Sequence, residues 1–220
     1  MPYDFHTHTF LSDGDLSPIE LIRRALVNGY DAIAITDHAS PSTIERVVDE
    51  VRRDCDMATL EWGIRALPGV ELTHCPAASI AHLAAWARRI GASVVVVHGE
   101  TLVEPVEEGT NRAAVRCPDV DILAHPGLVT AEEAGIAAES GVFLEITCRK
   151  GHCLTNGHVA RLAKEAGARL LVNTDAHSPS DLLTDGFARR VAIGAGLTEE
   201  EADVVLRDNA QALLKRILRG

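Results

Sequence analysis

Two histidines and an aspartate near the N-terminus could bind a metal ion. His6 and His8 are separated by one residue, and Asp13 follows shortly after them. Side chains at positions i and i+2 of a β-strand point to the same face, so the two imidazoles can be directed at one point. Imidazole nitrogens and carboxylate oxygens are ligands for zinc, manganese and iron. Three residues leave such a site incomplete, so we expect further ligands elsewhere in the chain.

Ionisable residues also follow most of the apolar segments that have the character of strands. These residues are His38, Glu71, His98, His125, Asp175 and His177. A single histidine at a strand end is usually an ordinary polar residue, but matching positions on successive strands favour a shared site. With the three N-terminal residues they make nine candidate ligands, which is too many for one ion with an open coordination position. The pattern therefore predicts two or three divalent ions.

Strands and helices are expected to alternate along the whole chain. Apolar runs predict strands over residues 3–7, 31–36, 64–71, 93–97, 121–124, 142–146 and 169–173. Helical spacing predicts helices over residues 18–28, 41–58, 76–90, 111–116, 130–140 and 156–166, and a last helix over about 198–219. This alternation indicates parallel strands with right-handed crossovers. A closed barrel and an open doubly wound sheet both fit it, although only a barrel would gather all the strand ends on one face.

Local signals predict where four of these helices begin. Thr130 is expected to cap the helix that runs to about Ser140. Ser17 is expected to cap the first helix, with Pro18 at its first position. Ser40 or Ser42 should cap the second, and a capping box from Thr198 to Glu201 should open the last. The expected apolar positions of the last helix are Val204, Val205, Leu206, Leu213, Leu214 and Leu218.

Composition limits the class of protein. A chain of 220 residues can form one domain with a sizeable core, and scarce aromatic residues (4%) suit buried strands under alanine-rich helices. The net charge of −11 argues against a broad basic surface for nucleic acid. It leaves an anionic substrate open, because bound metal ions reverse the local field.

The chain is expected to be cytoplasmic. Its five cysteines are odd in number and form no Cys-x-x-Cys pair, which fits a reducing compartment better than a disulfide framework. No basic segment followed by an apolar run begins the chain, so we expect no signal peptide. The apolar runs are shorter than the roughly 20 residues that span a bilayer, so no membrane association is expected. The sequence makes no prediction of the oligomeric state.

The motifs around the candidate ligands resemble those of the PHP (polymerase and histidinol phosphatase) family. In chain order they are His6-Thr7-His8, Ser12-Asp13-Gly14, Thr36-Asp37-His38, Gly69-Val70-Glu71, Val97-His98-Gly99-Glu100, Ala124-His125-Pro126-Gly127 and Thr174-Asp175-Ala176-His177. The resemblance runs from about residue 3 to residue 180. It implies an α/β fold in the form of a distorted (β/α)7 TIM-like barrel, as a single domain over residues 1–220 with the last helix packed on the barrel. It also implies a trinuclear metal centre and hydrolysis of phosphoesters.

The same resemblance implies which residues hold each ion. The first set is His6, His8, Glu71 and Asp175; the second is Glu71, His98 and His125, with Glu71 bridging; the third is Asp13, His38 and His177. Many family members have histidine where this chain has Asp13, and aspartate is also a metal ligand. We expect Asp37 to support the adjacent ligand His38.

The chemistry expected of such a centre is metal-assisted hydrolysis. A bound ion lowers the pKa of water from about 15.7 to about 7, which makes hydroxide available at neutral pH. Asp175 or His177 could move a proton as catalytic residues. Arg149 follows a predicted strand, and we expect it to clamp the substrate phosphate, assisted by Lys150 or His152. The simpler alternative is that Arg149 and Lys150 are solvated surface cations.

The function favoured by these features is that of a metal-dependent phosphatase or phosphodiesterase. Its substrate would be a small phosphorylated metabolite, such as histidinol phosphate, a nucleotide or a cyclic phosphate, and its ions manganese, zinc or iron. One alternative is an amidohydrolase-like C–N hydrolase, against which the bridging role of Glu71 and the Asp13/His38/His177 set argue. The other is a non-catalytic metal-binding module, which the intact ligand set disfavours. His74, His82 and His158 lie in or beside predicted helices and are not expected to be ligands.

Overall fold

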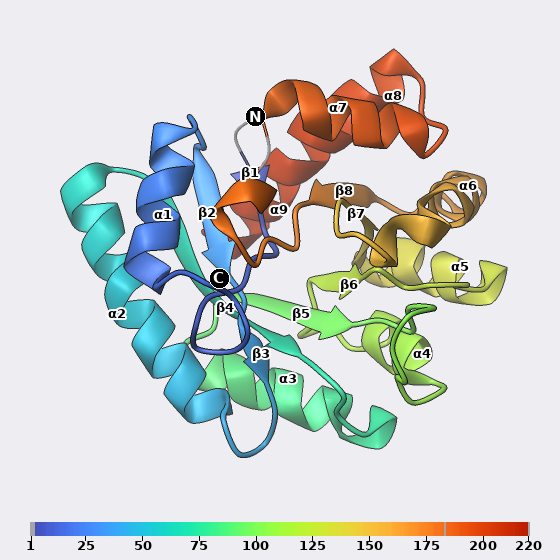
Figure 1. Cartoon of the computed structure of the whole chain (residues 1–220). Helices are drawn as coiled ribbons and strands as arrows, with labels where there is room; N and C mark the ends of the chain where they lie inside the picture. Colours follow the sequence, from blue (N-terminus) through green and yellow to red (C-terminus); the bar gives the residue numbers. More distant parts are fainter. Residues whose placement is uncertain (1–2, 183, 220) are drawn as a thin grey trace.

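Parallel strands form a nearly closed barrel in the computed structural model, which describes residues 3–182 and 184–219 (Figure 1). The strands are β1 Tyr3–Asp4, β2 Ala32–Ile35, β3 His38–Ala39, β4 Arg65–Leu72, β5 Val94–His98, β6 Ile122–Ala124, β7 Phe143–Thr147 and β8 Leu170–Asn173. Their order around the sheet is β1-β2-β4-β5-β6-β7-β8, and the short β3 pairs with β4. The expected (β/α)7 TIM-like barrel is therefore confirmed, and the open doubly wound sheet is excluded.

Helices follow the strands and cover the outside of the barrel (Figure 1). They are α1 Pro18–Val27, α2 Ile44–Trp62, α3 Ile80–Arg89, α4 Thr110–Val115, α5 Ala131–Ser140, α6 Asn156–Ala166, α7 Asp185–Gly194, α8 Glu199–Asp203 and α9 Ala210–Ile217. Short 3₁₀ turns are η1 Ala77–Ser79, η2 His152–Thr155 and η3 Pro179–Asp181, and η4 Val204–Asn209 is a π-helical stretch between α8 and α9. The apolar pattern predicted no helix at α7, and α2 begins later and ends later than the predicted range of 41–58. No helix in the described ranges is long and apolar enough to cross a membrane.

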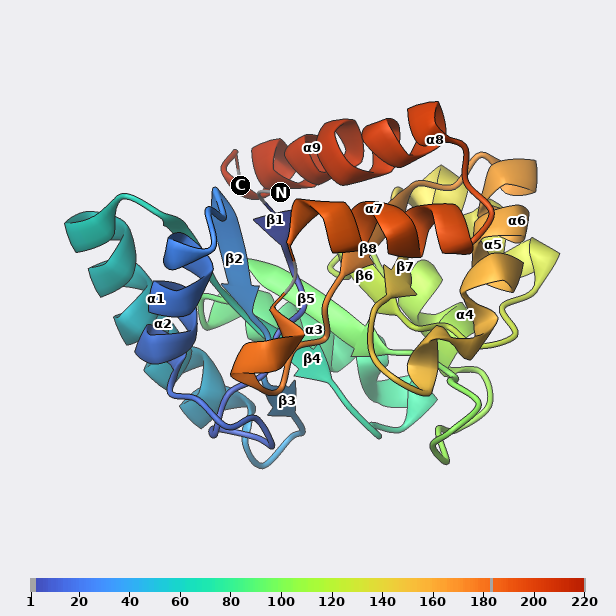
Figure 2. The ribbon, with the colours of Figure 1, turned by 45° about the horizontal axis from the view of Figure 1, so that its top comes forward.

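The strands are buried on both faces, which explains their uninterrupted apolar sequences. Every residue of β2 and β5 is buried. One face of the sheet packs against the surrounding helices, and the other fills the barrel interior with side chains that include Phe5, Val94 and Phe143. Leu213 of α9 packs against this interior cluster. Figure 2 shows α9 lying across the end of the barrel at which the strands begin, which leaves the opposite end for polar residues.

Backbone hydrogen bonds near the N-terminus close the barrel. The first predicted strand is shorter than expected, because β1 pairs with β2 only at Tyr3 and Asp4. The chain then continues alongside the end of β8, where Thr7 and Ala176 form a parallel bridge. His8 N donates to Ala176 O over 2.8 Å, and Asp175 N donates to His6 O over 3.0 Å. The two ends of the sheet are thus joined.

Three of the four expected helix starts are confirmed. The Thr130 hydroxyl accepts from Glu133 N at the start of α5. The Ser17 hydroxyl accepts from Glu20 N, and Thr198 and Glu201 form the predicted capping box. The prediction that Ser40 or Ser42 caps the second helix is wrong. The structure places Thr43 at that position without a side-chain cap, because Thr43 N donates to Ser40 O in a turn that delays the helix to Ile44.

The apolar face of the last helix differs from the prediction at two positions. Val204 is 45% exposed and Leu218 is 60% exposed, whereas Leu213 is fully buried. A π-helical stretch takes more residues per turn than an α-helix, so η4 shifts the face that the following residues present to the barrel.

Replacing Leu213 with alanine should test whether α9 is part of the barrel core. Loss of this buried side chain should lower the free energy of unfolding by about 2–5 kcal/mol, because it leaves a cavity in the interior cluster. Leu218→Ala, at the exposed residue that directly follows α9, should change it by less than about 0.5 kcal/mol. Urea denaturation followed by circular dichroism measures both. Equal losses in the two variants would contradict this role of α9.

Candidate metal centre

The nine predicted ligands lie in one connected cluster at the carboxyl ends of the strands. For every ligand but His98, a side-chain nitrogen or oxygen lies within 3.6 Å of such an atom of another ligand. His98 contacts the cluster through its ring, and the ring centroids of His98 and His125 are 4.5 Å apart. The members are His6, His8, Asp13, His38, Glu71, His98, His125, Asp175 and His177. Strand ends supply them because successive parallel strands all finish on the same face of the barrel.

The first group of donor atoms surrounds the pair of N-terminal histidines. The Nε2 atoms of His6 and His8 are 3.1 Å apart. His8 Nε2 is 3.2 Å from Asp175 Oδ1, and His6 Nε2 is 3.2 Å from Glu71 Oε1. The i, i+2 spacing therefore directs both imidazoles at one point, as the sequence predicts. The barrel-closing hydrogen bonds bring Asp175 to the same point.

A second group of donor atoms surrounds Asp13 on the outer side of the cluster. Asp13 Oδ2 is 3.2 Å from His177 Nε2, and Asp13 Oδ1 is 3.5 Å from His38 Nε2. His177 Nδ1 lies 2.9 Å from the carbonyl oxygen of Asp175, which can only accept, so Nδ1 carries the proton and Nε2 is left to face Asp13. The Asp13 side chain is 52% exposed, so this group is the most open to solvent of those described here.

Glu71 lies between the groups and shares its two oxygens among them. Oε1 is 3.2 Å from His6 Nε2 and 3.6 Å from His125 Nε2, and Oε2 is 2.6 Å from His38 Nδ1. The carboxylate is fully buried. This position is the one that a bridging ligand requires, because each oxygen faces a different set of imidazoles.

Two buried carboxylates that the sequence analysis missed hold the ligands in place. Glu145 Oε1 accepts from His6 Nδ1 over 2.8 Å, and its Oε2 accepts from the backbone N–H of His125 over 3.0 Å. Asp4 accepts from the hydroxyl of Thr174. Glu145 is the one carboxylate in β7, which is otherwise mostly apolar, and it shares the inward face with Phe143, which is a signal that could have identified it. Asp37, which was expected to support His38, instead holds the preceding loop by accepting from Thr9, and from the amide and hydroxyl of Ser12.

The electrostatics of the cluster favour cations. Burial raises the pKa of Asp175 to about 7. Burial also tends to raise the pKa of Glu71, but the imidazoles of His6, His98 and His38 hold that pKa well below its usual value. Burial and the imidazoles of His38 and His6 lower the pKa of His8 well below its usual value. Burial lowers the pKa of His38, but the carboxylates of Glu71 and Asp13 outweigh it and raise that pKa to about 10. The buried carboxylates therefore attract positive charge, which protons or divalent ions can supply.

Unpartnered atoms support the fit of metal ions. Among buried side-chain nitrogen and oxygen atoms in the described part of the chain, those without a hydrogen-bond partner are His8 Nδ1, Glu71 Oε1 and His125 Nδ1. Buried polar atoms are almost always partnered, so three exceptions within one cluster need an explanation. An ion would satisfy Glu71 Oε1, and nitrogen and oxygen donors of this kind suit divalent transition metals. The residues present therefore fit the metal centre that the ligand pattern predicts.

Backbone strain also marks this end of the barrel. The non-glycine residues with positive φ in the described ranges are His74 (50°), His125 (27°) and Asp175 (53°). Such conformations are costly for residues with a Cβ atom and persist mainly where the surroundings enforce them, often at functional sites. Two of the three are predicted ligands, and the third, His74, lies beside His98.

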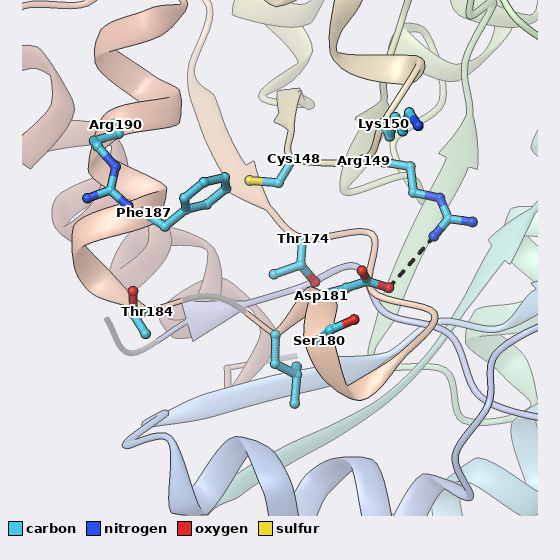
Figure 3. Close-up of a pocket in the computed structure, with 10 residues that line it drawn as sticks. Cys148, Arg149, Lys150, Thr174, Ser180, Asp181, Thr184, Phe187 and Arg190 are labelled. Atoms are coloured by element: carbon cyan, nitrogen blue, oxygen red, sulfur yellow. Dashed lines mark ion pairs between the residues drawn. The ribbon is translucent and has the colours of Figure 1, made fainter.

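The predicted phosphate-binding residues separate into two places. Arg149 and Lys150 line a cavity of about 690 Å³ that also includes Thr174, Phe187 and Arg190. Figure 3 shows Arg149 directed toward Asp181, and the two form an ion pair at 3.8 Å. The cavity adjoins the metal cluster, because Thr174 precedes Asp175 and Asp181 accepts from the backbone N–H of His177.

His152 lies away from that cavity and against the metal cluster. Its ring stacks on that of His125 with centroids 4.3 Å apart, and its Nδ1 lies 2.8 Å from the hydroxyl of Thr101. Its Nε2 is 3.5 Å from Glu104, a residue of the acidic loop after β5 that the sequence analysis did not single out. His74 also contacts Glu104. His158 is not among the residues of the cluster, and its Nε2 donates to Val129 O over 2.8 Å.

Comparison with known families and proteins gives an independent view of the chain. The sequence model described as the PHP domain matches residues 4–166. An uncharacterised protein of Methanocaldococcus jannaschii is 50% identical over 99% of this chain and 100% of its own length. A protein of Acetivibrio thermocellus named "Probable phosphatase" is 29% identical over 79% of this chain and 78% of its own length.

One solved structure has a fold similar to that of this chain. It comes from work on the metal-dependent tyrosine phosphatases YwqE of Bacillus subtilis and CpsB of Streptococcus pneumoniae, and it superposes with a TM-score of 0.56. The match covers 97% of this chain and 94% of that chain at 16% identity, so it is a likeness of fold.

Replacing Glu145 with glutamine should weaken metal binding without removing a ligand. The amide group lacks the charge that favours a proton on His6 Nδ1, and its nitrogen cannot accept from His125 N–H. Loss of such a supporting carboxylate typically lowers metal affinity by about 10–100-fold. Titration of the metal-free protein with Mn²⁺ measures the change. Glu139→Gln, an exposed change in α5, is the control and should bind as the unaltered protein does; equal affinity in the Glu145 variant would show that this support is unimportant.

Proposed function

The chain belongs to the PHP family, and we propose that it is a metal-dependent phosphoesterase that hydrolyses a small phosphorylated metabolite. The observation that carries the proposal is the convergence of six imidazoles and three carboxylates at one end of the barrel. The name of the Acetivibrio thermocellus relative supports phosphate chemistry over other hydrolysis.

We propose that the cluster holds three divalent ions, of manganese, zinc or iron. The ligand sets are His6, His8, Glu71 and Asp175 for the first ion, Glu71, His98 and His125 for the second, and Asp13, His38 and His177 for the third. The first and third sets are supported by proximity, because the donor atoms of His6, His8 and Asp175 lie within 4.8 Å of one another, and those of Asp13, His38 and His177 do so together with His8. Ions bound there would supply activated water at neutral pH and neutralise the charge of a phosphoryl group.

The protein's own contribution is to orient the ligand side chains and to hold protons on particular ring nitrogens. Glu145 keeps the proton of His6 on Nδ1, and the carbonyl oxygen of Asp175 does the same for His177, so both Nε2 atoms face the centre. His177 is the more accessible of the two residues that we expect to move a proton, with a side chain 11% exposed against 4% for Asp175.

The cavity beside the cluster is the proposed place for the substrate. Its volume of about 690 Å³ lies within the range of about 300–1,000 Å³ typical of small-molecule sites. Arg149, Lys150 and Arg190 line it in a chain whose net charge is −11, so positive charge is concentrated where an anionic substrate would enter (Figure 3). Asp181 fixes the Arg149 guanidinium and also holds the backbone of His177, which connects the phosphate clamp to the metal cluster. Histidinol phosphate, nucleotides and cyclic phosphates are candidate substrates.

A panel of phosphoesters tested with Mn²⁺, Fe²⁺ or Zn²⁺ examines this proposal. We expect phosphate release that a chelator abolishes and added metal restores, and Asp175→Asn should lower kcat/KM at least about 100-fold, because a ligand and a charge are lost. Asp56→Asn, an exposed aspartate in α2, should retain full activity. Hydrolysis of amides rather than phosphoesters would instead indicate a C–N hydrolase. Full metal occupancy without any hydrolysis would indicate a non-catalytic module.

Arg149→Ala tests the phosphate clamp on the best substrate of that panel. We expect kcat/KM to fall by about 10- to 150-fold, because hydrogen bonds to a charged group contribute about 1.5–3 kcal/mol. Arg149→Lys should recover only part of the loss, since lysine keeps the charge but lacks the two-pronged geometry. Arg65→Ala, at the exposed start of β4, is the control. An unchanged kcat/KM in the alanine variant would leave Arg149 as a surface cation.

A further inference from the structure

Glu104 reaches into the cluster from the loop between β5 and α4. Its Oε2 is 3.0 Å from His98 Nε2 and 3.3 Å from His74 Nε2, and its Oε1 is 3.5 Å from His152 Nε2. Three imidazole nitrogens therefore converge on one carboxylate. Neither the ligand motifs nor the family resemblance includes Glu104, His74 or a metal-binding role for His152.

The proton positions leave lone pairs facing this carboxylate. His98 Nδ1 lies 3.1 Å from the carbonyl oxygen of Gly99, which only accepts, so Nδ1 carries the proton in the neutral ring. Its Nε2 then presents a lone pair to Glu104, and two acceptors at 3.0 Å need a cation or a second proton between them. His152 also directs its Nε2 at Glu104. Its Nδ1 contacts the Thr101 hydroxyl, which can donate to a ring lone pair or accept from a ring N–H, so Nε2 is free to act as a ligand when Nδ1 carries the proton.

The spacing of these atoms suits ligands of a single ion. Metal–nitrogen and metal–oxygen bonds are about 2.0–2.2 Å long, so neighbouring ligands of one ion stand about 3.0–3.5 Å apart. Glu104 approaches His98 Nε2 through Oε2 at 3.0 Å and His152 Nε2 through Oε1 at 3.5 Å, so one ion between these histidines would meet both carboxylate oxygens. The donor atoms of His74, His98 and Glu104 lie within 4.8 Å of one another. One donor atom each from His98, His125 and His152 also lie within 4.8 Å of one another.

The loop that carries Glu104 is fixed at several points rather than extended into solvent. Thr101 bonds to His152 at its beginning. Glu100 Oε1 accepts from the backbone N–H groups of Gly109 and Asn111 across its base, and Glu107 accepts from Ala77 N. Glu104 is therefore held at the cluster by the same residues that shape the loop.

We propose that Glu104 and His152 complete the coordination of the divalent ion held by His98 and His125. The inference rests on the proposed metal centre and adds two ligands to its second ion. Three imidazoles and carboxylate oxygens suit zinc, manganese or iron. Through Glu104 the ion also ties down the loop over residues 101–109, whose Leu102 and Val103 are exposed beside the site.

Metal binding by the chelator-stripped protein tests the inference without recourse to activity. Mn²⁺ and Zn²⁺ are titrated by calorimetry, and bound metal is counted by elemental analysis after dialysis. We expect Glu104→Gln to lower the affinity for one of the bound ions by about 10–100-fold and to leave the affinity for the others unchanged. Glu108→Gln makes the same change of charge on an exposed residue of the same loop, and it should match the unaltered protein.

Hydrogen exchange of the loop gives a second readout. Metal should slow exchange at residues 101–109 in the unaltered protein and in Glu108→Gln, but much less in Glu104→Gln. Circular dichroism establishes that each variant is folded.

The possible results separate this inference from the proposed function. Unchanged metal number, affinity and loop protection in Glu104→Gln would overturn the inference and leave Glu104 as the partner of a protonated histidine, while the metal centre itself would stand. If the unaltered protein bound no divalent ion, the proposed function would fail, and the inference with it.

Discussion

The site depends on the hydrogen bonds that join the beginning of the chain to its last strand. His8 N donates to Ala176 O, and Asp175 N donates to His6 O, so segments that are far apart in the sequence become neighbours. In an open sheet the two segments would lie at opposite edges, and His6 and His8 would be separated from Asp175. Because β1 itself is short, this closure depends on a few backbone contacts beyond the regular strands. The strained backbone of Asp175 lies at the same junction.

Burying many ionisable groups in one place is costly unless each has a partner. The cluster meets this requirement at two levels. Glu145 and backbone carbonyl oxygens hold protons on the outward ring nitrogens of His6, His98 and His177. The inward nitrogens and the oxygens of Glu71 then face one another, an arrangement that cations stabilise. The apolar interior filled by Phe5, Phe143 and α9 lies beneath, and it gives the polar end of the barrel a rigid base.

Much of the fold could be predicted, because parallel strands buried on both faces leave short uninterrupted apolar runs. The helix at Asn156–Ala166 has the expected bounds. The last helix was less predictable, since the π-helical stretch η4 changes the face that its apolar residues present. Glu145 carried a signal that went unused, namely a lone carboxylate on the inward face of β7. Glu104 carried none, because it is one of several acidic residues in a loop whose position only tertiary contacts define.

The sequence by itself determined the α/β class and the positions of nine candidate ligands, since both follow from local patterns: apolar runs, and polar residues where those runs end. Those patterns fit an open sheet as well as a barrel, and the barrel was implied by the resemblance of the motifs to a family. Tertiary structure decided how these residues group. It placed both oxygens of Glu71 among different imidazoles, separated His152 from Arg149, and brought Glu104 to His98. The physical reason is that distances between side chains on different strands depend on barrel closure and loop anchoring, and no local pattern contains that information.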